Sequence, residues 1–258
     1  MINEKKTFGN VRENAEKVKT INRYRKIIPP ILGVIISFLF IIYVASLLFG
    51  KYGSFTITAV DFADRRYALT LCETPEFNRN TSRLNAQAAK NITNISVKDL
   101  PADLNDLDGS HNGENNLAYT FYVKNAGELA CNFRYSIVIS RATLGIEAAA
   151  RIRVYYNPDY YKAETKEFNY SGDYVDYAKP KTGGNGEPET DIYGNKQTNF
   201  AGDDLVLEGE TFNFAPNDIG KITVVIWLEG DDADCNDDIL GGQLRLDMLM
   251  EITGGVNE

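Results

Sequence analysis

The chain has 258 residues, of which 43% are hydrophobic and 24% are charged, a composition typical of a globular protein with one sizeable domain. Its net charge of −9 combines two parts of opposite sign: residues 1–26 carry eight Lys or Arg against three Glu, a net of +5, so the remaining residues carry −14. Because an excess of carboxylates repels phosphates, the large part is not expected to bind nucleic acid.

The first element in chain order is an apolar segment without any charged side chain, residues 27–50. Its most apolar stretch, nineteen residues long, would measure about 28 Å as a helix, close to the hydrocarbon thickness of a bilayer. Pro29 and Pro30 stand at its start, where a helix tolerates proline. The sequence therefore predicts one transmembrane signal-anchor helix over residues 27–50.

The basic residues crowd the N-terminal flank of this segment, which sets the expected orientation. We expect a cytoplasmic tail at 1–26 and an extracytoplasmic domain at 51–258, attached to the plasma membrane. The alternative is a cleaved signal peptide with Val44-Ala45-Ser46 as the small-residue cleavage site. The length of the basic segment favours the uncleaved anchor.

Beyond the anchor, alternation with period two predicts mainly β-structure. The predicted strands are 54–60, 92–97, 117–123, 131–139, 151–156, 204–208, 221–229 and 243–252. Short helices are expected at 81–91 and 144–150, and residues 157–203 are expected to be irregular, with 182–188 as a loop. Strands 117–123 and 131–139 are expected to form a hairpin around Asn125 and Gly127.

The two last predicted strands differ in pattern. Residues 221–229 are apolar on both faces, which predicts a central strand with Trp227 buried between two sheets or under a loop, whereas 243–252 alternate and have one wet face. Many short strands with few helices predict an antiparallel, jelly-roll-like β-sandwich.

Three cysteines make a poor disulfide framework, since at most one bridge can form. Cys131 is in phase with apolar neighbours and is expected in the core. Cys72 is ambiguous, and Cys235 is expected to be exposed.

Four sequence segments resemble known proteins: residues 109–128, 147–157, 177–180 and 224–248, the last of which contains WLEGDD. Together they resemble a group of single-pass surface proteins of Gram-positive bacteria. The layout is more distantly similar to camelysin and TasA-like sandwich proteins, some of which build biofilm fibres. The resemblance implies a fold and a surface location but no activity. A camelysin-type zinc site is not carried over, because the only histidine is His111 and no H-E-x-x-H motif is present.

The acidic turn after residue 228 is the best candidate site. Six carboxylates lie within ten residues: Glu229, Asp231, Asp232, Asp234, Asp237 and Asp238. Such hard oxygen ligands suit calcium, and we hypothesise a weak calcium site. The EF-hand pattern fails, since aspartate stands where its glycine is expected. The alternative is a solvated turn that ends the strand.

Two further segments each have a functional and a purely structural interpretation. Asp103, Asp106 and Asp108 lie in a second acidic loop, which is also an ordinary turn sequence. The tyrosine-rich stretch 155–177 would suit an aromatic platform for a sugar or a partner protein, or simple packing at a sheet edge.

We therefore expect a membrane-anchored surface protein with a non-enzymatic binding or structural role. No catalytic residue is assigned, and calcium is the only cofactor considered. A surface protein or a carbohydrate is the expected partner besides the membrane. The alternatives are a fibre subunit that assembles by strand exchange, and a surface hydrolase that uses paired carboxylates.

Overall fold

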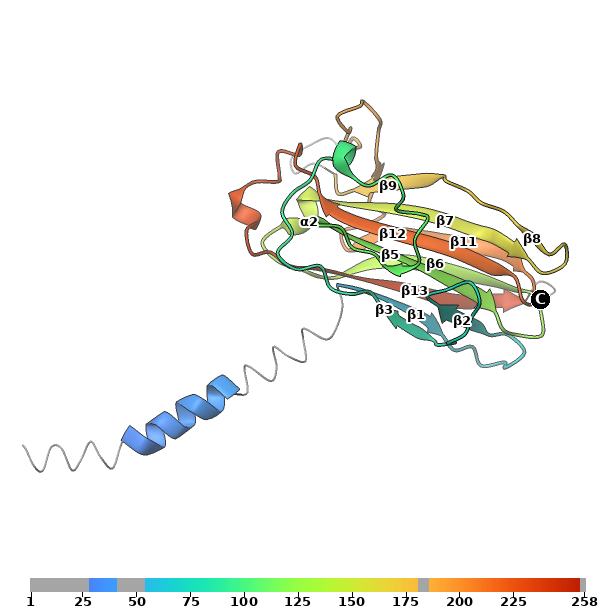
Figure 1. Ribbon diagram of the computed structural model, residues 1–258, viewed down its shortest axis with the longest axis horizontal. Helices are drawn as coiled ribbons and strands as arrows, with labels where there is room; N and C mark the ends of the chain where they lie inside the picture. The colour runs from blue at the N-terminus through green and yellow to red at the C-terminus, as the bar shows by residue number, and fades with distance from the viewer. Residues whose placement is uncertain (1–27, 41–53, 181–185, 256–258) are drawn as a thin grey trace, which may run out of the picture. The chain divides into compact units, whose positions relative to one another are not determined.

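The computed structural model describes residues 28–40, 54–180 and 186–255 (Figure 1). The chain divides into two compact units, Met1–Lys51 and Tyr52–Glu258, and all the described strands belong to the second. The large unit is mainly β, as predicted.

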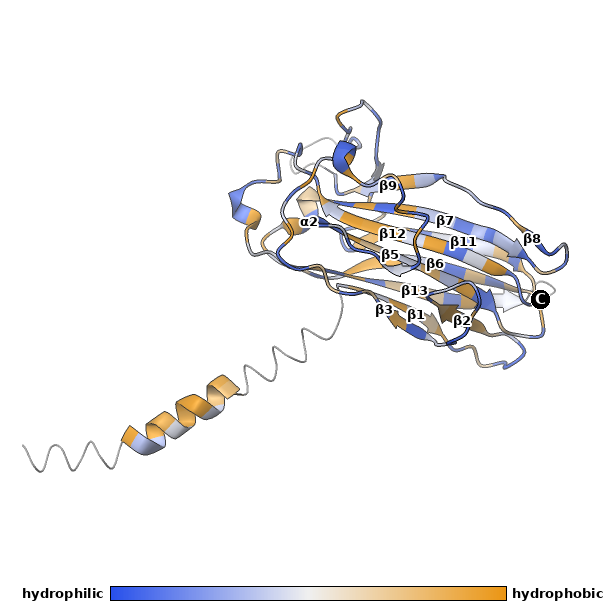
Figure 2. Ribbon diagram, in the orientation of Figure 1, coloured by the Kyte–Doolittle hydropathy of each residue, from blue (hydrophilic) through white to orange (hydrophobic). Residues whose placement is uncertain are grey.

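The first unit contains one described element, a helix at residues 28–40 whose side chains are exposed and mostly apolar (Figure 2). Within the described parts of the chain, no helix reaches the length and apolarity that a bilayer crossing requires. The predicted tail at 1–26 and much of the predicted anchor at 27–50 lie outside the described residues, so both stay predictions.

Five strands form the first sheet, called sheet A, in the spatial order β11-β6-β13-β1-β3. Their bounds are β1 Phe55–Val60, β3 Arg83–Asn85, β6 Cys131–Ala142, β11 Leu205–Phe214 and β13 Leu244–Gly255. Strands β1 and β13 run parallel, with Phe55 opposite Leu246, while the other pairs are antiparallel.

The second sheet, sheet B, has the order β10-β9-β7-β12-β5-β2, with β4 on β5 and β8 on β7. Its strands are β2 Leu69–Cys72, β4 Gly109–Ser110, β5 Asn116–Asn125, β7 Ala150–Lys162, β8 Glu167–Phe168, β9 Tyr174–Ala178, β10 Thr198–Asn199 and β12 Ile219–Leu228. Strands β9 and β10 are parallel. Both sheets are therefore mixed, and the expectation of purely antiparallel sheets is wrong, because an alternating pattern does not encode strand direction.

Inward-facing side chains of both sheets share one hydrophobic core. Sheet A contributes Phe55, Ile57, Phe133, Ile137, Leu246, Met248 and Met250, and sheet B contributes Leu71, Tyr119, Phe121, Ile152, Val154, Ile222 and Val224. Two sheets that face one another across such a core are consistent with a β-sandwich. Along β13 the buried residues alternate with exposed ones, as predicted, and Leu249 is the exposed apolar exception.

Strand β12 is the interior strand that the sequence predicts, and all ten of its residues are buried. It lies between β7 and β5. Ile222, Val224 and Ile226 belong to the core between the sheets. Trp227 is fully buried in a second cluster on the outer face of sheet B, where Val97 and Leu104 cover it. The tryptophan is thus under a loop and not between the sheets.

The predicted hairpin of 117–123 and 131–139 is wrong, because β5 belongs to sheet B and β6 to sheet A. The connection between them crosses from one sheet to the other, and Asn125 fixes it. The buried Asn125 amide donates to the carbonyl oxygens of Leu129 at 2.9 Å and Phe214 at 2.7 Å, and accepts from the Gly127 N–H at 2.9 Å. Turn residues thus mark a change of direction without specifying which strand pairs next.

Two other local predictions fail for a tertiary reason. Residues 81–91 form no helix: β3 pairs with β1, and the Ala86 N–H donates to the Phe55 carbonyl at 2.9 Å. Residues 92–97 form only an isolated bridge, Ile95 to Glu229, before a 3-10 turn at Val97–Asp99. In the first of these segments, the pairing of β3 with β1 overrides helix propensity.

The region expected to be irregular, 157–203, is more ordered than predicted. Strand β7 continues to Lys162, and β8, β9 and β10 follow. Residues 182–185 of the predicted loop lie outside the described residues. The helical turn α2, Ile146–Ala149, leads directly into β7 as predicted.

Candidate functional site

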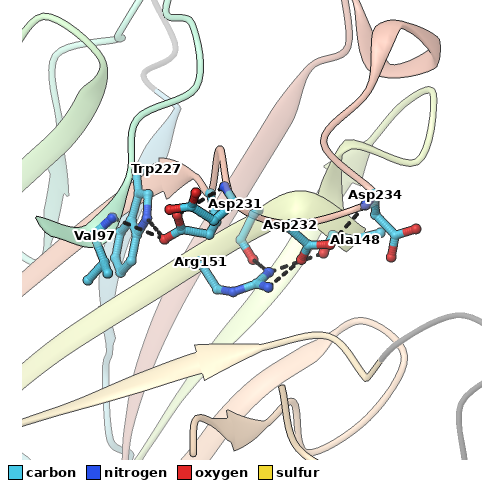
Figure 3. A network of polar contacts seen from close by, with 9 residues as sticks. Val97, Ala148, Arg151, Trp227, Asp231, Asp232 and Asp234 are labelled. Atoms are coloured by element: carbon cyan, nitrogen blue, oxygen red, sulfur yellow. Dashed lines mark hydrogen bonds and ion pairs between the residues drawn. The ribbon is translucent and has the colours of Figure 1, made fainter. Parts of the chain in front are cut away.

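The WLEGDD segment begins at the end of β12, and Val97 of a covering loop lies beside its tryptophan, Trp227 (Figure 3). Glu229 is buried, and its Oε2 accepts from the Trp227 indole N–H at 3.0 Å and from the Val97 N–H at 3.2 Å. Its Oε1 accepts from the Asp231 N–H at 3.3 Å. The carboxylate therefore holds the loop over the tryptophan ring.

Asp232 forms a buried ion pair with Arg151 of β7, the strand beside β12. The exposed fractions of the two side chains are 2% and 3%. Arg151 also donates to the carbonyl oxygens of Ala148 and Ala150, each at 3.2 Å, and the Asp234 N–H donates to Asp232 at 2.8 Å. This pair ties the acidic turn to the neighbouring strand.

The remaining predicted ligands are not drawn into one cluster. Asp231 accepts from the Ser96 hydroxyl at 2.5 Å. Asp237 and Asp238 stand in a 3-10 turn, Asp237–Ile239, whose N-cap Asn236 accepts from the Asp238 N–H at 2.9 Å. In the described residues, no group of three or more His, Cys, Asp or Glu side chains is placed to hold a metal ion. The calcium hypothesis stays a prediction.

Cys235 was expected to be exposed, but it is half-buried and packs with Ile146, Ala150 and Leu228. Burial raises the pKa of its thiol, and the nearby carboxylates of Asp232 and Glu229 add to this. Cys131 is buried in the core as predicted, Cys72 is buried as well, and all three thiols are free.

The second acidic loop lies across the outer face of sheet B. The Asp106 N–H donates to the Asp103 carbonyl at 2.9 Å, which is an ordinary turn, and Asp108 accepts from the Tyr122 hydroxyl at 2.6 Å. Lys221 of β12 donates to the Asn105 carbonyl at 2.5 Å. Burial lowers the pKa of this lysine, and Asp108 and Asp106 counteract the effect. These bonds hold the loop over the outer face of sheet B.

His111 is half-buried and fixes the same loop. Its Nδ1 lies 2.9 Å from the Gly109 carbonyl oxygen and its Nε2 lies 2.9 Å from that of Leu104. Leu104 in turn covers Trp227. The imidazole ring therefore connects two backbone segments of the loop.

The tyrosine-rich stretch forms a group of aromatic side chains on β7, β8, β9 and the loop before β9. We call this group the ring cluster, and it consists of Tyr155, Tyr160, Tyr161, Phe168, Tyr170 and Tyr174. Tyr170 is 79% exposed, Phe168 53% and Tyr174 50%. The sequence indicated such a platform, and the tertiary structure brings its rings together.

Buried groups back the exposed rings. Tyr160 is buried, and its ring centroid lies 5.6 Å from that of Phe168 and 5.5 Å from that of Tyr170. The Arg153 guanidinium lies 3.8 Å from the centroid of the Tyr174 ring. It is held there by Asp176, through two bonds of 2.7 and 2.8 Å. The exposed rings therefore stand on a fixed base.

A depression beside β2, which the sequence did not indicate, has a volume of about 440 Å³. It is lined by Cys72, Glu73, Thr74, Asn78, Arg79, Asn80, Thr81 and Leu84. Glu73 accepts from the Tyr119 hydroxyl at 2.7 Å, which braces β2 against β5. Most of the polar lining residues are exposed, so this depression is shallow.

Comparisons with protein-family models, with curated proteins and with solved structures found no match to this chain. The resemblance read from the WLEGDD phrase and its companions therefore stays a prediction.

Proposed function

We propose that this protein is a membrane-anchored binding module of the bacterial cell surface, without a catalytic role. In this proposal residues 27–50 form the anchor, residues 1–26 are cytoplasmic, and residues 51–258 form a jelly-roll-like sandwich outside the cell. The resemblance to single-pass surface proteins and the basic flank of the apolar segment support the location.

The ring cluster is the observation that carries the binding role. Large aromatic side chains are normally withdrawn from water, yet Phe168, Tyr170 and Tyr174 remain at least half exposed above buried, hydrogen-bonded neighbours. Exposed apolar groups surrounded by polar ones are typical of interaction sites. A rigid base lowers the entropy cost of binding, since the rings need no further ordering.

The pairing of the buried carboxylates supports a binding module over a hydrolase. Glycoside hydrolysis requires two carboxyl groups that face each other across a substrate. Glu229 is bonded to Trp227, and Asp232 is paired with Arg151. In this proposal the acidic WLEGDD turn thus has a structural role and no catalytic one.

The position of β1 supports an anchored module over a fibre subunit. Strand exchange requires an N-terminal strand that can leave its own sheet. Strand β1 is paired on both sides, with β13 and with β3. Its release would break both ladders.

The location is tested on intact cells that express the full-length protein with an epitope tag at each end. We expect external protease to remove the C-terminal tag and leave the N-terminal tag protected. Extraction of membranes with alkali should leave the N-terminal tag in the membrane fraction. Protection of both tags, or release of the N-terminal tag by alkali, would contradict the proposal.

A further inference from the structure

We propose that the ring cluster binds a neutral oligosaccharide. This inference rests on the proposed function and names the ligand class of its binding surface.

Charge argues against an anionic ligand. Two cations that lie over rings of the cluster already have partners: Arg153 is paired with Asp176, and Lys221 donates to the Asn105 carbonyl. A phosphate or carboxylate would have to compete for them, at a cost typical of breaking a buried pair. A neutral ligand leaves these pairs intact.

Area argues against a large protein partner. At about 200 Å² for each ring, the exposed fractions of Phe168, Tyr170 and Tyr174 amount to roughly 360 Å². A stable protein interface buries about 800 Å² on each partner, much of it around aromatic anchors. The area suits a small, amphipathic ligand whose C–H faces stack on the rings while its hydroxyl groups stay hydrated.

Spacing argues for an oligomer. The exposed rings form two groups: Phe168 and Tyr170 beside Tyr160, and Tyr174 beside Tyr155. Tyr155 lies opposite Thr223 of β12 and Tyr161 opposite Ile219, so this part of β7 spans four positions of β12, roughly 13 Å along a strand. One sugar unit cannot contact both groups, so a chain of several units should bind more tightly than its monomer.

The β7–β8 hairpin that carries Phe168 is held by polar bonds. The Asn157 amide donates to the Asn169 carbonyl at 2.6 Å, and the Asn169 N–H donates to the Tyr160 carbonyl at 2.9 Å. Tyr161 and Phe168 are direct partners in the ladder. Binding should therefore require little rearrangement of the backbone.

The test uses full-length protein in detergent, titrated calorimetrically with chitohexaose, cellohexaose and maltohexaose. The corresponding monosaccharides and the polyanion polygalacturonate serve as comparison ligands. We expect at least one neutral hexasaccharide to bind, and more tightly than its monosaccharide. Tyr170→Ala and Phe168→Ala should each weaken that binding by about tenfold or more, the range found for loss of one stacked ring.

Phe212→Ala is the matched control, because Phe212 is 63% exposed but lies on β11 in sheet A. It should leave binding unchanged. Binding of no neutral hexasaccharide, binding of polygalacturonate alone, or unchanged affinity in Tyr170→Ala would overturn the inference. Each of these results leaves the proposed surface display intact, since the tag-protection experiment decides that separately.

Discussion

Side chains at the end of β12 hold the covering loop against sheet B. Trp227 has an indole N–H that needs a partner once it is buried, and Glu229 supplies it. The same carboxylate bonds the loop above the ring. One aromatic residue and one acid thus connect the central strand to its cover.

Replacement of Trp227 tests this arrangement. Trp227→Ala should cost about 3–5 kcal/mol in the free energy of unfolding, because it leaves a large cavity under the loop. Urea titration followed by circular dichroism measures the loss. Phe212→Ala, at an exposed position, should change the stability by less than about 0.5 kcal/mol. An emission maximum of the native protein typical of exposed indole would refute the burial.

The Arg151–Asp232 pair makes a second prediction at the residue scale. Asp232→Asn leaves the buried guanidinium without its counter-charge, so unfolding should become easier by about 3–5 kcal/mol. The control is Glu210→Gln, which alters the exposed pair with Arg134 and should cost less than about 1 kcal/mol. Equal losses of unfolding free energy in the two variants would show that the buried pair contributes no more to stability than the exposed pair.

At the scale of elements, the β5–β6 connection decides which sheet each strand joins. Gly127 lies in this connection, and a Cβ built there would stand 2.4 Å from the Arg66 carbonyl oxygen and 2.8 Å from the Ala68 nitrogen. The same two residues bond the loop: the Ala126 N–H donates to the Ala68 carbonyl oxygen, and the Glu128 N–H donates to the Arg66 carbonyl oxygen, both at 2.8 Å.

Gly127→Ala should therefore destabilise the protein by about 1–3 kcal/mol, the range for an overpacked site. Thermal unfolding of the two variants Gly127→Ala and Gly172→Ala provides the comparison. Gly172 has open space at its Cβ position, so its replacement should be nearly neutral. A neutral Gly127→Ala would mean that the connection can shift away from residues 66–68.

The acidic turn is the other element whose role is open to experiment. Since Glu229, Asp231 and Asp232 already have partners, a role as charged boundary predicts that millimolar calcium leaves the melting temperature of the full-length protein unchanged. A rise that Asp237→Asn combined with Asp238→Asn abolishes would instead establish the calcium site. These two substitutions leave the Arg151 pair intact.

At the scale of the whole molecule, the core contains weak acids that ionise late. Burial raises the pKa of Cys131 from 9.0 to about 11 and that of Tyr135 from 10.0 to about 12. Between the unfolded and folded values the unfolded chain binds fewer protons than the folded one. The free energy of unfolding therefore has its full value below about pH 9 and decreases as the pH rises above that value.

Urea unfolding measured from pH 8 to pH 11 tests this. Each such group contributes a loss of about 1.4 kcal/mol per pH unit within its window. Cys131→Ala should lower stability at every pH but make the decline between pH 9 and pH 11 shallower. The same slope in both proteins would show that the thiol ionises alike in the folded and unfolded states.

Features that depend on local pattern could be predicted from the amino-acid sequence. The apolar run of 221–229 gave a central strand, the alternation of 243–252 gave a strand with one wet face, and the phase of Cys131 placed it in the core. The acidic turn and the tyrosine-rich stretch could also be identified as candidate sites. Periodicity reports which face of a strand is buried, and it does so without reference to its neighbours.

The pairing of distant segments became visible in the folded structure alone. The fold paired β1 with β13 in parallel, sent β5 and β6 to different sheets, and made β3 a strand where an alanine-rich segment favours a helix. It also gave Glu229 and Asp232 their partners, Trp227 and Arg151, and separated the six acids that the sequence had grouped. The physical reason is that these bonds join residues far apart in the chain, and local propensity carries no information about such partners.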